Sequence, residues 1–181
     1  MKNLRIIALS DTHGFSYRIN EIIKKQPDAD FYIFLGDCED RIMNTNDLKN
    51  FFEENPEYKS KFLVVRGNCD TDKTVPFNMV IDAGVHKIYA THGHKQNVSG
   101  GYDRIVYEAM REECDIILHG HTHVRCLKKE GDVSIMCPGS VGMPRDGKPA
   151  SFGIIDILSD GSFDMHIADV WYILIYIIWW K

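Results

Sequence analysis

The first two thirds of the chain alternate between short apolar runs and segments with helical spacing. Ser16–Lys25 places Ile19, Ile22 and Ile23 on one face, which predicts an amphipathic helix. Short apolar runs bounded by polar residues are typical of buried strands. Strands are predicted at Leu4–Leu9, Ala29–Leu35, Phe62–Val65 and Cys114–Leu118, further helices at Asn46–Asn55 and Ser99–Glu113, and a hairpin from Asn78–Ala83 and Val85–Ala90 that turns at Gly84.

After His123 the pattern contains strands only. The predicted strands are Val124–Leu127, Val133–Met136, Phe152–Ile157 and Phe163–Ala168, with turns at Gly131 and at Asp160-Gly161. We interpret the first part as βαβ units and the second part as an antiparallel meander. The sequence shows no linker or repeat, so we expect an α/β fold with one domain over residues 1–181, built as a two-sheet β-sandwich flanked by helices.

The C-terminal run Trp171–Trp180 is apolar throughout and is too short to cross a membrane as a helix. Its β-branched and aromatic residues favour a strand. Alternation along a strand would leave both of its faces apolar, so both must be covered. We predict a homo-oligomer that buries this run; an internal strand covered by the chain's own helices and attachment to a membrane surface are the alternatives.

The composition and charge of the chain limit the partners and the cellular compartment that we expect for it. The chain has 181 residues, is 44% hydrophobic and carries a net charge of −5, without a dense block of Lys or Arg. A nucleic-acid partner is therefore not expected, and neither is a membrane partner. The five cysteines are scattered without a CxxC pair, which fits a reducing cytoplasm, and the apolar start of the chain is too short for a signal peptide.

The residues that could bind metal or take part in catalysis lie where the predicted strands end. Five such ends carry Asp, Asn or His beside glycine: Asp11-Thr12-His13-Gly14, Gly36-Asp37, Gly67-Asn68-Cys69-Asp70, His92-Gly93-His94 and His119-Gly120-His121-Thr122-His123. Ligands of α/β sheets bind beyond the carboxyl ends of the strands, so these segments can meet at one rim. Their oxygen and imidazole ligands suit divalent metals, and there are enough of them for two ions that share a carboxylate.

These motifs, in this order, resemble those of the calcineurin-like metallophosphoesterases, and more closely their small prokaryotic phosphodiesterase branch (YfcE-like). Each motif alone is weak, whereas all five in order, each behind a strand, are specific. Pro138-Gly139-Ser140 and Pro144-Arg145 are also similar to a late loop of that branch. The likeness extends from residue 4 to about residue 157 and implies the four-layer αββα metallophosphoesterase fold.

The resemblance also implies roles for single residues. A first ion would be held by Asp11, His13, Asp37 and His123, and a second by Asp37 as the bridge with Asn68, His92 and His121. Mn²⁺ is the expected ion, with Mg²⁺, Ni²⁺, Fe and Zn²⁺ as alternatives, because such ligand sets accept several borderline ions. The implied reaction is hydrolysis of a small phosphodiester by a hydroxide that bridges the ions.

One position departs from many phosphatases of the family. They carry a proton-donating His after the Gly-Asn pair, where this chain has Cys69, as the small prokaryotic branch does. A thiol is a poor general acid at neutral pH, so we expect good leaving groups to be favoured; Cys69 as a merely packed thiol is the alternative. The candidate catalytic set is Asp37, Asn68, Cys69, Asp70 and His94, with Asp70 as an orienting residue and His94 either on the substrate or supporting the metal ligands.

Two rival functions remain beside the phosphodiesterase. The first is a phosphomonoesterase of the same fold. The second is a non-catalytic scaffold that resembles a retromer subunit with this fold and a degraded metal site. The presence of all seven expected metal ligands favours an enzyme over the scaffold.

Overall fold

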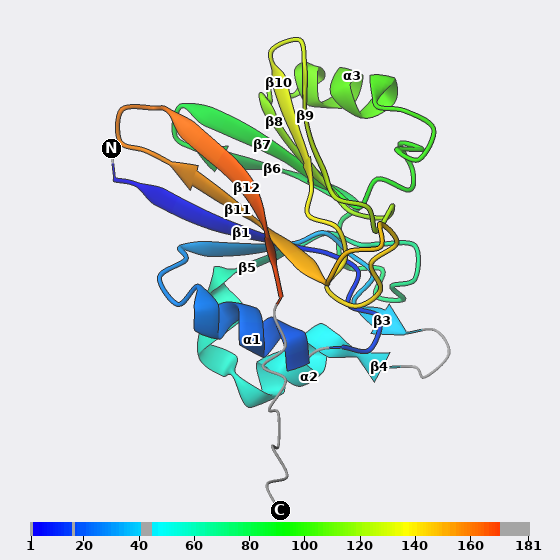
Figure 1. Cartoon of the computed structure of the whole chain (residues 1–181). Helices are drawn as coiled ribbons and strands as arrows, with labels where there is room; N and C mark the ends of the chain where they lie inside the picture. The colour runs from blue at the N-terminus through cyan, green and yellow to red at the C-terminus, as the bar shows by residue number, and fades with distance from the viewer. Residues whose placement is uncertain (1, 16, 41–44, 171–181) are drawn as a thin grey trace, which may run out of the picture.

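The computed structural model describes residues 2–15, 17–40 and 45–170. The apolar run Trp171–Trp180, with its predicted strand and oligomer contact, lies outside the described residues. Two five-stranded sheets pack face to face, with α1 and α2 against the outer face of one sheet and α3 against the outer face of the other (Figure 1). The expected four-layer αββα sandwich is confirmed.

The first sheet has the strand order β12-β11-β1-β2-β5. Its strands are β1 (Leu4–Leu9), β2 (Phe31–Phe34), β5 (Phe62–Val64), β11 (Ser151–Ile157) and β12 (Phe163–Asp169). The strands β1, β2 and β5 run parallel, and β11 pairs antiparallel with β1, with Ala8 opposite Gly153. Helices α1 (Tyr17–Lys25) and α2 (Asp47–Glu54) cover this sheet, and Ile19 and Ile22 of α1 are fully buried against it.

The second sheet has the order β6-β7-β8-β10-β9. Its strands are β6 (Asn78–Ala83), β7 (His86–Thr91), β8 (Ile116–His119), β9 (Cys126–Glu130) and β10 (Val133–Cys137). Strands β7 and β8 run parallel, as the connection through α3 (Asp103–Arg111) requires. The helix is shorter than the predicted Ser99–Glu113, because the residues before it form turns.

The predicted antiparallel pairing holds within the hairpins β9–β10 and β11–β12, but the predicted continuous meander is wrong. Strand β10 lies parallel to β8, with Ser134 opposite Ile116, and the hairpin β11–β12 joins the other sheet. Burial explains the arrangement: β10 is largely buried and lies inside the sheet, whereas β9 carries the exposed Lys128 and Lys129 and takes the edge. The sequence pattern identified these strands but not all of their partners.

Short elements and the core complete the fold. Strands β3 (Glu39–Asp40) and β4 (Thr45–Asn46) and the 3₁₀ helix η1 (Pro56–Lys61) were not predicted. One apolar cluster lies between the two sheets, a second lies under α1 and α2, and a third lies under α3. In the described part of the chain, no helix has the length and apolar character needed to cross a bilayer.

Candidate metal centre

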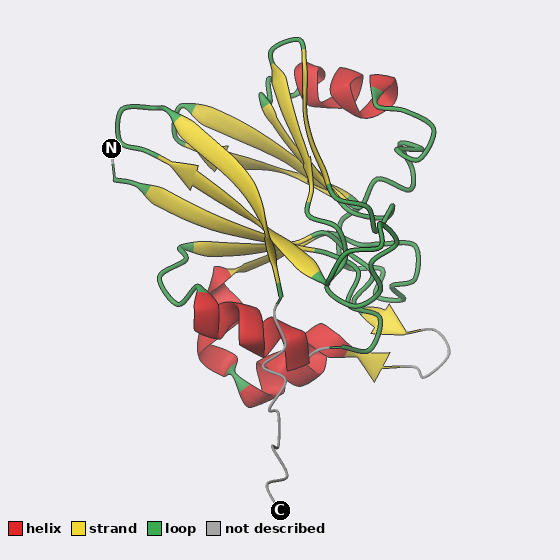
Figure 2. Ribbon diagram, viewed as in Figure 1, coloured by secondary structure: helices red, strands yellow, loops and turns green. Residues whose placement is uncertain are grey.

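The polar strand ends meet at one end of the sandwich. Because β1, β2 and β5 are parallel in one sheet and β7 and β8 in the other, their carboxyl ends emerge at the same edge, where the loops gather in Figure 2. Backbone bonds hold the loops together within each sheet: Asp11 N donates to Gly36 O at 3.0 Å, and Gly120 N donates to His92 O at 3.1 Å. The sandwich thus brings residues from positions 11 to 123 into one site.

Three of the predicted ligands form a buried cluster around Asp11. Nε2 of His123 lies 3.1 Å and Nε2 of His13 lies 3.7 Å from Asp11 Oδ1, and the two Nε2 atoms are 3.4 Å apart. Asp11 is fully buried, and its Oδ1 accepts no hydrogen bond. The three donor atoms lie within 4.8 Å of one another, close enough for one ion to touch all of them.

A second cluster surrounds Asp37. Nε2 of His92 lies 3.4 Å from Asp37 Oδ2 and 3.1 Å from Asn68 Oδ1. Asp37 Oδ2 is also 3.8 Å from His13 Nε2, so its carboxylate lies between the two clusters, in the position predicted for a bridge. The seventh predicted ligand, His121, is near but belongs to no metal-sized group of described residues; its ring lies 5.2 Å from that of His92.

Hydrogen bonds at Nδ1 of two histidines determine which ring nitrogen carries the lone pair in the neutral ring. His92 Nδ1 lies 2.6 Å from Leu35 O, and His123 Nδ1 lies 2.6 Å from Met143 O. A carbonyl only accepts, so each Nδ1 carries a proton, and in the neutral ring Nε2 turns a lone pair toward the carboxylates. Buried acceptors facing acceptors repel one another unless a cation lies between them. The residues present therefore fit divalent metal ions.

The shifted pKa values of Asp11 and His92 also indicate a site that attracts cations. Burial opposes the charged form of Asp11, but its neighbours His123 and His13 outweigh burial and hold the pKa of this carboxyl well below its usual range. Burial likewise disfavours a charged His92, yet Asp37 and Asp11 raise its pKa to about 9. The two buried carboxylates thus produce a field strong enough to retain a proton nearby, and the same field attracts metal cations.

Backbone strain is concentrated at the same residues. Of the seven described residues other than glycine with a positive φ angle, two lie elsewhere, at Asn97 and Glu113, and five lie at the site: Asp11 (56°), His13 (43°), Asp37 (57°), His121 (69°) and His123 (58°). Such residues rarely adopt this conformation, and it persists where the surrounding structure imposes it. All five are predicted metal ligands, so the fold accepts local strain in order to aim these side chains inward.

Asp70 lies beside the clusters and binds backbone rather than reaching into them. Its carboxylate accepts the N–H groups of Asp37 at 2.9 Å, Cys38 at 2.8 Å and Gly67 at 2.7 Å. These bonds tie the loop after β5 to the loop after β2. Asp70 therefore positions the Asp37 segment, in line with its predicted orienting role.

Replacing Asp70 with asparagine should lower the free energy of unfolding by about 2 kcal/mol, because an amide presents an N–H to at least one backbone N–H that now bonds a carboxylate. Urea denaturation measures the loss. Asp160→Asn is the control: Asp160 accepts N–H and O–H bonds from Ser162 but is exposed. Equal effects of the two substitutions would contradict the bracing role of Asp70.

Cys69 and His94 line the approach to the site. Cys69 N donates to Asp37 Oδ1 at 2.7 Å, and its thiol, which is not fully buried, lies with His13 and Asp37 in one group of possible ligands. The His94 ring is 5.3 Å from His92 and 5.7 Å from Phe77. Burial, with help from His92 and His121, lowers the pKa of His94 to about 4.

The remaining histidine of the His119–His123 stretch belongs to the core. His119 is fully buried, its ring lies 5.4 Å from the Tyr102 ring and is tilted against it, and burial lowers the pKa of His119 to about 4. Sequence reasoning did not assign roles to two serines: Ser10 Oγ donates to Asp11 Oδ2 at 2.5 Å, and Ser140 Oγ donates to Asp11 O at 2.8 Å. The only sequence signal was the Pro-Gly-Ser run that contains Ser140.

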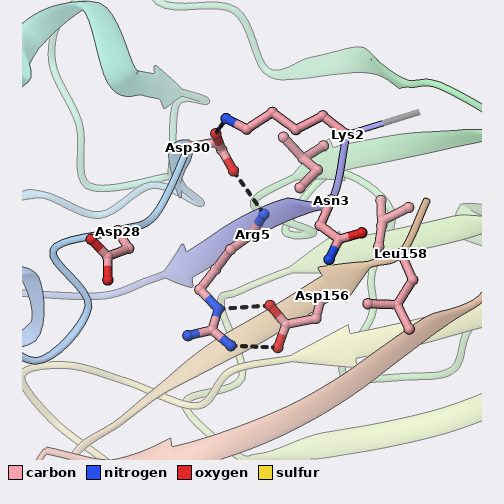
Figure 3. A pocket seen from close by; sticks show the side chains of 9 residues that line it. Lys2, Asn3, Arg5, Asp28, Asp30, Asp156 and Leu158 are labelled. Atoms are coloured by element: carbon pink, nitrogen blue, oxygen red, sulfur yellow. Dashed lines mark hydrogen bonds and ion pairs between the residues drawn. The ribbon is translucent and has the colours of Figure 1, made fainter.

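A different cavity, of about 380 Å³, opens where β1 begins, at the opposite end of that strand from the clusters. Figure 3 shows the side chains that line it. There Arg5 forms a two-pronged ion pair with Asp156, at 2.7 and 2.8 Å, and Lys2 contacts Asp30 at 3.0 Å. These charges neutralise one another in an exposed setting, which makes the cavity a weaker candidate than the metal clusters.

Comparison with known proteins gives one family. The model of the calcineurin-like phosphoesterase superfamily domain matches residues 4–160. Phosphodiesterase YfcE of Escherichia coli K12 is 27% identical over 173 residues, which cover 84% of this chain and 88% of YfcE. A predicted phosphoesterase from Streptococcus pneumoniae TIGR4 superposes with a TM-score of 0.77 at 28% identity, covering 94% of this chain and 91% of that one. Vacuolar Protein Sorting 29 of Cryptosporidium parvum shares the fold, with a TM-score of 0.65 at 18% identity over 93% of this chain and 98% of that one.

Proposed function

Because the chain belongs to the calcineurin-like phosphoesterase superfamily, we propose that it is a phosphodiesterase that uses two divalent metal ions, with Mn²⁺ as the expected metal. One observation supports this most strongly. The Nε2 atoms of His92 and His123, whose rings are oriented by backbone carbonyls at Nδ1, converge on the two buried carboxylates of Asp37 and Asp11, and Asp11 Oδ1 lacks a hydrogen bond. Such a set of acceptors has the chemistry of a metal site.

Different residues of the chain would bind the ions and orient the ligands. Asp11, His13 and His123 would hold one ion, Asn68, His92 and His121 would hold the other, and Asp37 would touch both. Ions bound there lower the pKa of a water molecule and stabilise the charged oxygens of a phosphoryl group. Leu35 O and Met143 O fix the orientation of the rings of His92 and His123, and Asp70 holds the segment of Asp37, so that the ligands are in place before substrate arrives.

Hydrolysis of bis(4-nitrophenyl) phosphate tests the proposal. The protein, stripped of metal by a chelator, should be inactive, and Mn²⁺ should restore turnover; Mg²⁺, Ni²⁺, Fe²⁺ and Zn²⁺ are compared in parallel. The same assay with 4-nitrophenyl phosphate separates a phosphodiesterase from a phosphomonoesterase. Absence of turnover with every metal would contradict the proposal and favour the scaffold, for which the likeness to Vacuolar Protein Sorting 29 supplies the fold alone.

Cys69→Ser should retain most of the activity on nitrophenyl diesters, because an activated leaving group needs no proton from the enzyme. Cys69→His should help esters with poor leaving groups more than activated ones. Values of kcat for methyl 4-nitrophenyl phosphate and for a dialkyl phosphate measure this difference. A collapse of the serine variant on the activated ester would show that the thiol is essential.

Oligomer formation through Trp171–Trp180 remains a separate proposal, supported by the apolar character of this run. Light scattering of the full chain beside a chain truncated after Val170 tests it. Identical masses corresponding to a monomer would contradict it.

A further inference from the structure

A cavity of about 490 Å³ adjoins the metal clusters, between the loop that leads from β5 to β6 and the loop after β7. It shares Asn68 and His94 with the site, so a substituent of a bound phosphodiester can extend into it. Its further lining includes the two cations Arg66 and Lys73, the acidic residue Asp70 and the ring of Phe77. The chemistry of this lining therefore bears on which substrates fit.

Cations surround the Phe77 ring. Cζ of Arg66 lies 3.9 Å and Nζ of Lys95 lies 3.3 Å from the ring centroid. Both groups occupy the space over the ring that a stacked base would need, so Phe77 orients cations through its π-electrons and is not open as a stacking platform. The ring also packs beside His94, which links this cationic arrangement to the metal clusters.

The two cations of the lining form no close ion pair. Over the described residues, ion pairs within 4.0 Å include none with Arg66 or Lys73. Arg66 Nη1 donates to the backbone carbonyl of Asp72 at 3.3 Å, and Arg66 Nε is buried without a hydrogen-bond acceptor. Nearby acidic groups are engaged elsewhere: Asp70 binds three backbone N–H groups, and Asp72 accepts N–H and O–H bonds from Thr74 at 2.8 and 2.6 Å. The cations of the lining are therefore available to bind an anion.

A neighbouring cavity shows the contrast. It also contacts Phe77 and Lys95, but it holds Glu108 and Glu112 as well. Glu108 accepts hydrogen bonds from Arg104 at 3.1 Å, Gln96 at 2.7 Å and the Tyr89 hydroxyl at 2.9 Å, so its carboxylate is paired with a cation of that same cavity. Arg66 and Lys73 line the cavity beside the metal clusters and not this neighbouring one.

We infer that this cavity, with Arg66, Lys73 and Phe77 in its lining, is a subsite for an anionic substituent, and that the preferred substrates are phosphodiesters in which one ester arm carries a further negative group such as a carboxylate or phosphate. The inference rests on the proposed phosphodiesterase activity and specifies its substrate class. Exposed cations are strongly hydrated, so the subsite acts mainly through charge and should be sensitive to salt.

A matched pair of substrates tests it. Both are aryl 4-nitrophenyl phosphodiesters, and the second ring carries either a meta-carboxylate or the neutral carboxamide of nearly equal size. Chromatography of both released phenols gives kcat/KM whichever arm leaves. We expect the carboxylate to be preferred about tenfold at low salt, mostly through KM, and the preference to shrink in 0.5 M NaCl.

Variants test whether the preference for the carboxylate ester arises from the cations of this cavity. In the Arg66→Gln/Lys73→Gln protein, which lacks both cations of the cavity lining, the ratio of the two kcat/KM values should fall to near one; because the ratio is taken within one protein, any common loss of activity cancels. Lys24→Gln, an exposed position on α1, makes a single lysine-to-glutamine change remote from the cavity and should keep both activity and preference. Circular dichroism checks that the variants are folded.

The outcomes separate the two proposals. Turnover of both esters at equal efficiency by the unaltered protein would overturn the subsite and leave the phosphodiesterase standing. A preference that persists in the double variant would also overturn it, since the charges would then come from elsewhere. No turnover of either ester with any of the metals would overturn the phosphodiesterase and the subsite together.

Discussion

Asp37→Asn is expected to lower kcat/KM for bis(4-nitrophenyl) phosphate by about three orders of magnitude, because one carboxylate serves both proposed ions and a neutral amide cannot hold them. The fold should survive. Asparagine is nearly the same size, and its oxygen can still accept the Cys69 N–H that Asp37 Oδ1 now accepts at 2.7 Å. Steady-state kinetics with Mn²⁺ and elemental analysis of bound metal measure the two effects.

Thermal unfolding adds a readout that does not depend on turnover. Without metal, the variant should be less stable than the unaltered protein at neutral pH: burial disfavours the charged form of Asp37, but His92 and the Cys69 N–H outweigh burial and lower the pKa of this carboxyl, so its charge stabilises the fold. With Mn²⁺, the unaltered protein should gain in Tm and the variant should gain less, because ligand binding stabilises the folded state by mass action. Asp132→Asn, at an exposed turn, is the control and should change nothing. Near-normal turnover of Asp37→Asn with Mn²⁺ would show that the bridge is assigned wrongly.

Gly67→Ala is expected to abolish most activity and to destabilise the fold, although it adds a single methyl group to a residue that is not itself a proposed metal ligand. A Cβ at position 67 would lie 2.0 Å from Asp37 Oδ1 and 2.4 Å from Asp37 N. A side-chain oxygen could rotate away, but the backbone nitrogen is held by Asp70, so the loop itself must move. We expect a loss of kcat/KM of at least about a hundredfold, since misplacement of a site by about 1 Å has effects of this size.

Gly100→Ala is the matched control for this substitution. A Cβ there would approach Asn97 Nδ2 at 2.6 Å, which is the movable end of a side chain. Kinetics and urea denaturation of the two variants should differ strongly. If Gly67→Ala were as active and as stable as Gly100→Ala, the close packing of the two loops could not be a requirement of the site.

The sequence was informative about the site because of where its polar residues fall. Each motif directly follows a strand, and the carboxyl ends of parallel strands share an edge, so position along the chain already predicts proximity. The structure places Asp11, His13, Asp37, Asn68, His92 and His123 in two adjoining clusters. The ring of His121 lies close by, although without a donor atom in those groups of described residues.

By itself, the sequence also determined most of the elements and the layered fold, because apolar periodicity is a local property that survives folding. Only the tertiary structure decided which strands pair: β10 lies beside β8 and β11 crosses to the other sheet, choices that depend on which surfaces are left to bury. Only the tertiary structure decided how the ligands are aimed. Asp70 binds the backbone around Asp37, and Leu35 O and Met143 O set the protons of His92 and His123. Those partners are far apart along the chain, and backbone carbonyls carry no sequence signal, so their roles arise only when the strands have closed into a sandwich.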